Sequence, residues 1–164
     1  VQLTIYQFVV KYLSKIYQKI IDPYLPQESY KYVLLLAVLY LEHGQAENQK
    51  NSGRKTSSRN YAERALSFQP SLGKAYLLIA NLYASSANAC GTSQFNKRAV
   101  YWLAAQTAQK AGRVDASIKK IANKTAASFN GRAPTKTDIF TEGNQGKIVT
   151  FSCWIRRSVK VPNL

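Results

Sequence analysis

Side chains capable of metal binding or nucleophilic chemistry are scarce in this chain. It contains one histidine, His43, two cysteines, Cys90 and Cys153, and eight Asp and Glu residues. A zinc site needs three or four closely spaced ligands, and His43 is distant from both cysteines. A cysteine–histidine nucleophilic pair stays open, although neither cysteine lies in a recognisable motif. The sequence therefore predicts no metal site.

The sequence also lacks the short motifs that bring catalytic or cofactor-binding groups together. No phosphate-binding loop, dinucleotide-binding loop, serine-hydrolase elbow or zinc-protease motif occurs. His43 follows an apolar segment, where a histidine most often complements the negative end of a helix. We therefore predict a protein that is not an enzyme, with no catalytic residues and no cofactor.

The charge balance is strongly basic. The 164 residues include 23 Lys and Arg against eight Asp and Glu, which gives a formal net charge of +15. These cations are spread along the chain, and no block of five or six like charges occurs. Two interpretations stay open. The charge can be a solvated basic surface, or it can attract nucleic acid, anionic lipid headgroups or an acidic protein.

Apolar residues make up 46% of the chain, which is enough to build a core. The longest uninterrupted apolar run spans 32–41, about half of what a transmembrane helix needs, so no span is predicted. Apolar residues recur at helical spacing in six segments, whereas polar residues without a period predict loops over 45–57 and 84–94. The predicted helices cover 1–22, 28–42, 58–68, 72–84, 95–110 and 116–129, and Asp115 is the expected N-cap of the last one.

The last thirty residues have a different character. Residues 135–140 predict one short turn of helix, and 142–146 have the composition of a turn. Residues 147–155 are rich in β-branched and aromatic side chains, which favours a strand. Val159 and Val161 lie on either side of the charged Lys160, an alternation that favours a second short strand. We therefore predict a short β-hairpin that caps the helices.

Two segments repeat the same pattern on one helix face. Residues 33–40 and 76–83 each place large, aliphatic, small and tyrosine residues at positions i, i+3, i+4 and i+7. Residues 60–70 have the spacing of a second helix that ends in a proline. This pattern resembles the tetratricopeptide repeat (TPR), which stacks antiparallel helical hairpins into an α-solenoid. The resemblance implies an all-α, TPR-like repeat domain over 1–129, followed by an extension over 130–164 with the β-hairpin.

A second resemblance extends over about residues 60–162. The order of its motifs, from YAERAL through GKAYLLIANLYASS and KRAVYWLA to CWI, is similar to the C-terminal part of envelope-associated TPR proteins of Gram-negative bacteria. The resemblance implies a periplasmic or envelope location. In that compartment a Cys90–Cys153 disulfide is favoured over the two buried thiols expected of a cytosolic protein. It also implies a non-enzymatic scaffold or adaptor with protein partners in a larger envelope complex.

TPR proteins bind peptides in a groove lined by the first helix of each repeat. By this resemblance, the candidate groove residues are Lys74, Leu77, Asn81, Lys120, Asn123 and Lys124. Charge-assisted hydrogen bonds from the lysines could hold a carboxylate, or the same residues could form a solvated face. The alternative function is that of a basic helical nucleic-acid-binding protein, and peripheral contact with an anionic membrane also stays open.

Overall fold

The computed structural model describes residues 52–164. The helices predicted over 1–22 and 28–42, and with them His43, lie outside the described residues. Within 52–164 the chain is mostly helical and ends in a two-stranded antiparallel hairpin. The elements are α3 (Ser52–Phe68), α4 (Gly73–Ala84), α5 (Ala87–Cys90), α6 (Gln94–Val114), the 3-10 turn η1 (Ala116–Ile118), α7 (Lys119–Asn130), α8 (Lys136–Thr141), β1 (Ile148–Phe151) and β2 (Arg157–Lys160).

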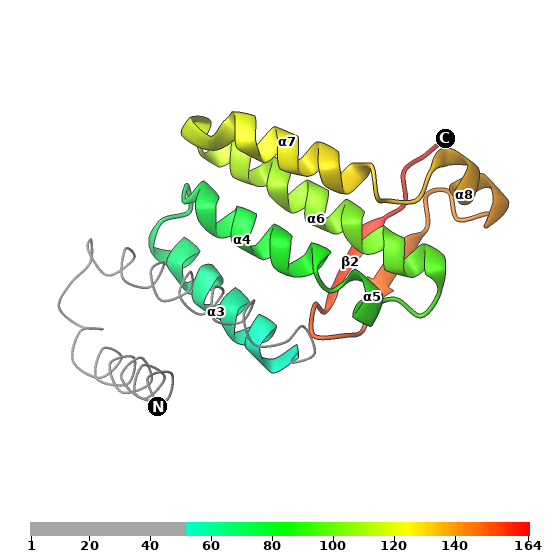
Figure 1. Ribbon diagram of the computed structural model, residues 1–164, viewed down its shortest axis with the longest axis horizontal. Coiled ribbons are helices and arrows are strands. Elements are labelled where there is room, and N and C mark those ends of the chain that lie inside the picture. Colours follow the sequence, from blue (N-terminus) through cyan, green and yellow to red (C-terminus); the bar gives the residue numbers. More distant parts are fainter. Residues whose placement is uncertain (1–51) are drawn as a thin grey trace, which may run out of the picture.

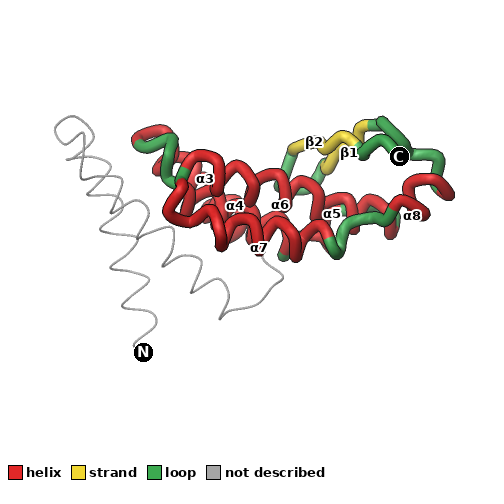
Figure 2. The backbone as a smooth tube through the Cα atoms, turned by 90° about the horizontal axis from the view of Figure 1, so that it is seen from above, coloured by secondary structure: helices red, strands yellow, loops and turns green. Residues whose placement is uncertain are grey.

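The four long helices α3, α4, α6 and α7 lie side by side in chain order (Figures 1 and 2). Helix α6 packs against both α4 and α7, and α4 packs against α3. Small residues make this close packing possible, since α6 buries five alanines (Ala99, Ala104, Ala105, Ala108 and Ala111). The predictions of helices over 72–84 and 116–129, with Asp115 as an N-cap, are confirmed.

Three predicted boundaries were wrong. Residues 52–57 belong to α3 and not to a loop, because Lys55 Nζ anchors this polar helical turn on Ser85 O at 2.9 Å and Ser86 Oγ at 3.1 Å. Helix α6 continues through Gly112, where a Cβ atom would lie 3.0 Å from Ala122 Cβ. That glycine therefore allows α6 and α7 to approach, and it does not end the helix. The loop predicted over 84–94 contains the short helix α5.

The C-terminal hairpin is present but shorter than predicted. Strand β1 ends at Phe151, and residues 152–155 form a tight turn in place of further strand. Strand β2 follows, with Val149 opposite Val159. The inward side chains Phe151, Ile155, Val159 and Val161 are almost fully buried in the main core. Their burial fixes the hairpin against α6, which both strands contact.

A disulfide joins the hairpin to the helices. The Cys90 and Cys153 sulfur atoms are bonded, with a Cα–Cα distance of 5.3 Å, so the predicted pair is confirmed. Cys90 is the last residue of α5, and Cys153 lies in the turn between β1 and β2. The bond therefore connects two segments that are 63 residues apart in sequence.

The predicted helix at 135–140 is present as α8, and it begins with a capping box. The Asp138 backbone N–H donates to Thr135 Oγ1, and the Asp138 carboxylate accepts from the Thr135 backbone N–H at 2.6 Å. Arg98 Nη1 lies 2.8 Å from the same carboxylate and connects α8 to α6.

These contacts predict a pH dependence of stability. The hydrogen bonds from Thr135, and secondly the Arg98 charge, lower the pKa of Asp138 below its ordinary value of about 3.9. A carboxyl whose pKa is lower in the folded protein than in the unfolded chain stabilises the fold at any pH above its pKa in the unfolded chain. That contribution is lost as the pH falls below about 4 and through the folded-state pKa. We expect the stability difference between the wild type and Asp138→Asn to shrink over this range in denaturant titrations. A difference that stays constant with pH would contradict the prediction.

Candidate partner-binding surfaces

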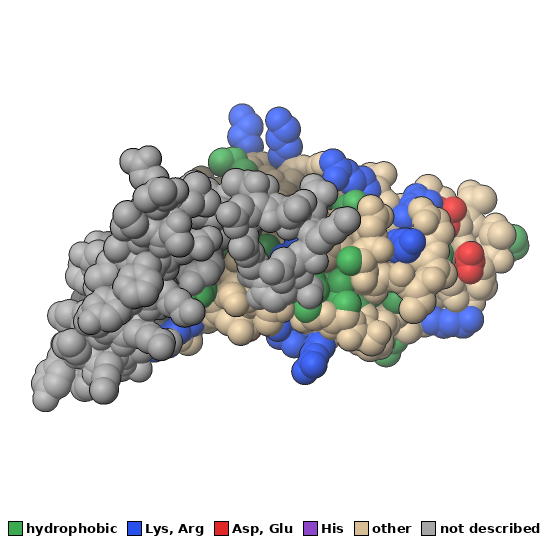
Figure 3. Space-filling view, turned by 60° about the horizontal axis from the view of Figure 1, so that its bottom comes forward, with side chains coloured by type: hydrophobic (Ala, Val, Ile, Leu, Met, Phe, Trp, Pro, Cys, Tyr) green, Lys and Arg blue, Asp and Glu red, His purple; other side chains and the backbone are tan. Residues whose placement is uncertain are grey.

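The described part of the chain carries nearly all of the net charge. Residues 52–164 hold 18 Lys and Arg but only four Asp and Glu. Three of these acidic side chains have partners within the protein: Glu63 pairs with Arg157, Asp138 pairs with Arg98, and Asp115 caps η1. In the face shown in Figure 3, Lys and Arg side chains are widely spread, whereas acidic atoms are confined to one end. The surface is therefore available to an anionic partner.

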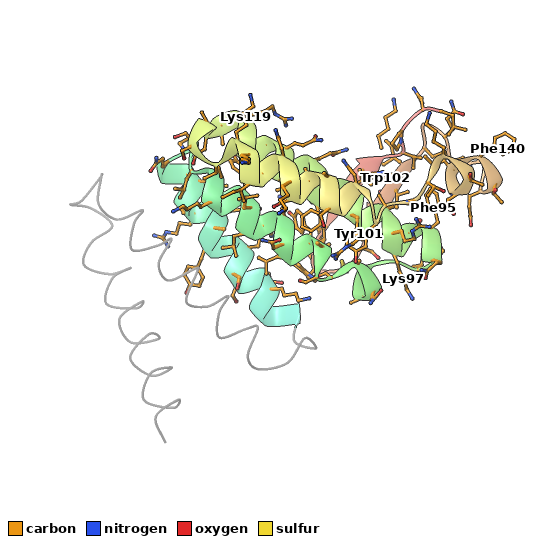
Figure 4. All side chains as sticks on the ribbon, turned by 45° about the horizontal axis from the view of Figure 1, so that its top comes forward. Phe95, Lys97, Tyr101, Trp102, Lys119 and Phe140 are labelled. Atoms are coloured by element: carbon orange, nitrogen blue, oxygen red, sulfur yellow. A yellow bond between two sulfur atoms is a disulfide. The ribbon has the colours of Figure 1, made fainter. Side chains whose placement is uncertain are left out.

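One exposed surface combines positive charge with an apolar side chain. Helix α7 buries Ala122, Ala126 and Phe129, and its opposite side faces solvent. The exposed residues of its first two turns, which we name the α7 outer face, are Lys119, Lys120, Ile121, Asn123 and Lys124, and Lys120 and Lys124 lie directly opposite the buried side. Ile121 is 60% exposed, so an apolar side chain is available to a partner next to these lysines. Figure 4 labels Lys119 where α7 begins.

The predicted groove residues occupy two helices. Lys74 and Asn81 are exposed on α4, while Leu77 is half-buried and contacts the main core and the smaller cluster of Ala111, Ile118 and Ala122. The other three residues, Lys120, Asn123 and Lys124, belong to the α7 outer face. A single groove shared by the two sets stays a prediction.

A second feature, which the sequence did not predict, is a cleft of about 470 Å³ on the other side of α4. We name it the α3–α4–α6 cleft, after the helices that line it. Its floor is formed by Leu66, Tyr76, Ile79, Tyr83 and Leu103, and its rim by Glu63, Gln106, Thr107, Lys110, Arg113 and Arg157. Seven-residue spacing places Tyr76 and Tyr83 on one face of α4. Tyr83 belongs to the main core, whereas Tyr76 is half-buried.

The rim of this cleft is basic at both ends. Lys110 Nζ lies 4.7 Å from the centre of the Tyr76 ring, in a cation–π contact. At the other end, Arg157 Nη2 lies 3.4 Å from Glu63 Oε1. Burial raises the pKa of the Tyr83 hydroxyl, and the Arg59 and Arg157 charges act in the opposite direction. The hydroxyl therefore stays protonated at neutral pH.

The hairpin reaches the cleft because Arg59 fixes its turn to α3. Arg59 Nη1 donates to Ile155 O at 2.8 Å and to Trp154 O at 3.2 Å, and its guanidinium lies 5.3 Å from the Trp154 ring centre. Trp154 Nε1 in turn donates to Ser86 Oγ at 3.2 Å. These contacts position Arg157, which follows directly in β2. Sequence reasoning missed Arg157 because 94 residues separate it from Glu63.

Comparisons with known proteins add no assignment. No family model, no curated protein and no solved structure matches this chain. Within residues 52–164, no group of three His, Cys, Asp or Glu side chains is arranged to hold a metal ion. No helix in the same range is both long enough and apolar enough to cross a membrane.

Proposed function

We propose that this protein is a non-enzymatic, TPR-like adaptor that binds an acidic segment of a partner protein in a bacterial cell-envelope assembly. The order of helix packing supports the proposal, because each long helix contacts the next, as stacked antiparallel hairpins do. The disulfide is compatible with an oxidising compartment, and the periplasm is the proposed one.

The α7 outer face carries this proposal. Lys120 and Lys124 lie one turn apart on the solvated side of α7, and the exposed Ile121 lies beside Lys124 at the i+3 spacing. A protein interface needs apolar area at its centre and charges at its rim, and the charges set partner choice and association rate. Ile121 provides apolar surface, and the adjacent Lys120 and Lys124 provide charges that favour carboxylates.

The excess of 18 basic over four acidic residues favours a second candidate, a nucleic-acid-binding protein. Nucleic-acid binding depends mainly on phosphate contacts and falls steeply with salt. It gains little from an apolar residue such as Ile121, which is why we favour the protein partner.

Charge reversal on the α7 outer face tests the proposal. We expect Lys120→Glu/Lys124→Glu to reduce capture of the partner from envelope fractions by about tenfold, since two attractions become repulsions. The control is Lys136→Glu/Lys147→Glu, which makes the same charge change at two exposed lysines outside α7. Capture is measured by pull-down and mass spectrometry at low and high salt.

An equal loss of partner capture in both double variants would contradict the proposal, because binding would then depend only on the net charge of the protein. Retention of nucleic acid or ribosomal material at low salt only would support the second candidate in its place.

A further inference from the structure

We propose that the α3–α4–α6 cleft is a second binding site. Its ligand is an extended acidic peptide segment with a large apolar side chain and one carboxylate on each side of it. The cleft and the α7 outer face are different surfaces, so either can fail while the other stands. The volume of about 470 Å³ is in the range of pockets that accept a few side chains.

The floor of the cleft is suited to one apolar anchor. Leu66 of α3, Ile79 of α4 and Leu103 of α6 meet there from three helices. Ile79, Tyr83 and Leu103 are buried, whereas Leu66 and Tyr76 are only half-buried and present the free apolar surface of the floor. A large apolar side chain that enters would remove this surface from water, which is the main source of affinity at such a site.

The charges of the rim define the two ends of the ligand. Lys110 and Arg113 are at the Tyr76 end, and Arg157 is at the Tyr83 end. Tyr76 and Tyr83 are seven residues apart on α4, which corresponds to about 10 Å along the helix axis. The rim cations lie near each of the two tyrosines. In an extended peptide, positions i, i+2 and i+4 point to the same side, and i and i+4 are about 13 Å apart. Carboxylates at i and i+4, with an apolar residue at i+2, therefore match the cleft.

Two cationic ends favour a peptide over a single-headed amphiphile. A fatty acid has one carboxylate and would leave one end of the rim without a partner. Among the described residues, no carboxylate pairs with Lys110 or Arg113, so this end is available. The Arg157 end is partly occupied, because Glu63 lies 3.4 Å from Arg157 and 3.7 Å from Arg59.

Glu63 is thus an internal competitor for the ligand. Its carboxylate uses the same cation that the second ligand carboxylate would use, and it repels that carboxylate. Replacing it with glutamine should strengthen binding, whereas a disturbed fold would weaken it. Glu63→Gln therefore separates a direct effect on the cleft from a loss of structure.

The test uses the full chain and a fluorescein-labelled peptide with the central sequence Glu-Ser-Phe-Ser-Glu, measured by fluorescence anisotropy. We expect saturable binding, about fivefold weaker binding for Lys110→Gln and for Arg157→Gln, and about threefold tighter binding for Glu63→Gln. Lys136→Gln is the matched control, since Lys136 is an exposed lysine on α8 that does not line the cleft.

Three outcomes would each overturn the proposal. They are the absence of saturable binding, equal weakening by Lys136→Gln and Lys110→Gln, and equal binding of the peptide in which both Glu residues are Gln. None of these outcomes bears on the α7 outer face, whose test uses a different ligand and different variants.

Discussion

Reduction of the Cys90–Cys153 disulfide is expected to lower the free energy of unfolding by about 4 kcal/mol. The bond joins positions 63 residues apart. In the chain-entropy account, a cross-link over such a loop stabilises mainly by restricting the unfolded chain. The bond also holds the hairpin turn against α5, which places Arg157 at the cleft. We therefore expect both lower stability and weaker peptide binding after reduction.

Denaturant unfolding with and without a reductant measures this effect. Cys90→Ser/Cys153→Ser is the control, because a reductant should change its stability little. If the double variant were as stable as the oxidised wild type, the account of the disulfide would be wrong.

Truncation of Phe151 is expected to have the next largest effect. Its side chain is 1% exposed and lies in the main core, between the hairpin and the helices. Removing a buried phenylalanine side chain costs about 3–5 kcal/mol, from lost burial and the cavity that remains. We expect Phe151→Ala to lower the free energy of unfolding by that amount.

Ile148 provides a matched control on the same strand. It is 70% exposed, so Ile148→Ala should change stability by less than about 0.5 kcal/mol. Both values come from chemical denaturation of the oxidised protein. Similar losses in the two variants would mean that the hairpin does not pack on the helices as described.

Local patterns in the sequence predicted much of this fold. Helical periodicity located α4, and the Asp115 cap located the start of η1 and α7. The run of β-branched and aromatic residues located the hairpin. These signals depend on neighbouring residues, so they can be read from one sequence.

The errors arose where tertiary contacts override local preference. Residues 52–57 are polar and aperiodic, yet they are helical, and Lys55 connects this segment to the distant Ser85 and Ser86. Gly112 usually signals a helix end, yet here it lets α7 approach α6. The pairing of cysteines likewise came from a resemblance and not from local sequence.

The two candidate surfaces differ in how far they could be predicted. Lys120 and Lys124 of the α7 outer face were identified from the sequence through the TPR resemblance, and their four-residue spacing places them on one side of a helix. The α3–α4–α6 cleft combines three helices with Arg157 of β2. No spacing along the chain indicates that these residues meet.

Site-specific photocrosslinking from position 121 would test the adaptor proposal most directly. A photoreactive phenylalanine analogue in place of Ile121 should form one dominant adduct, with an acidic protein, in native envelopes. Lys120→Glu/Lys124→Glu should abolish that adduct, whereas Lys136→Glu/Lys147→Glu should preserve it. The same analogue at Phe140, which is exposed at the α8 end in Figure 4, should not form it. Adducts with nucleic acid, or the same adducts from positions 121 and 140, would contradict the account.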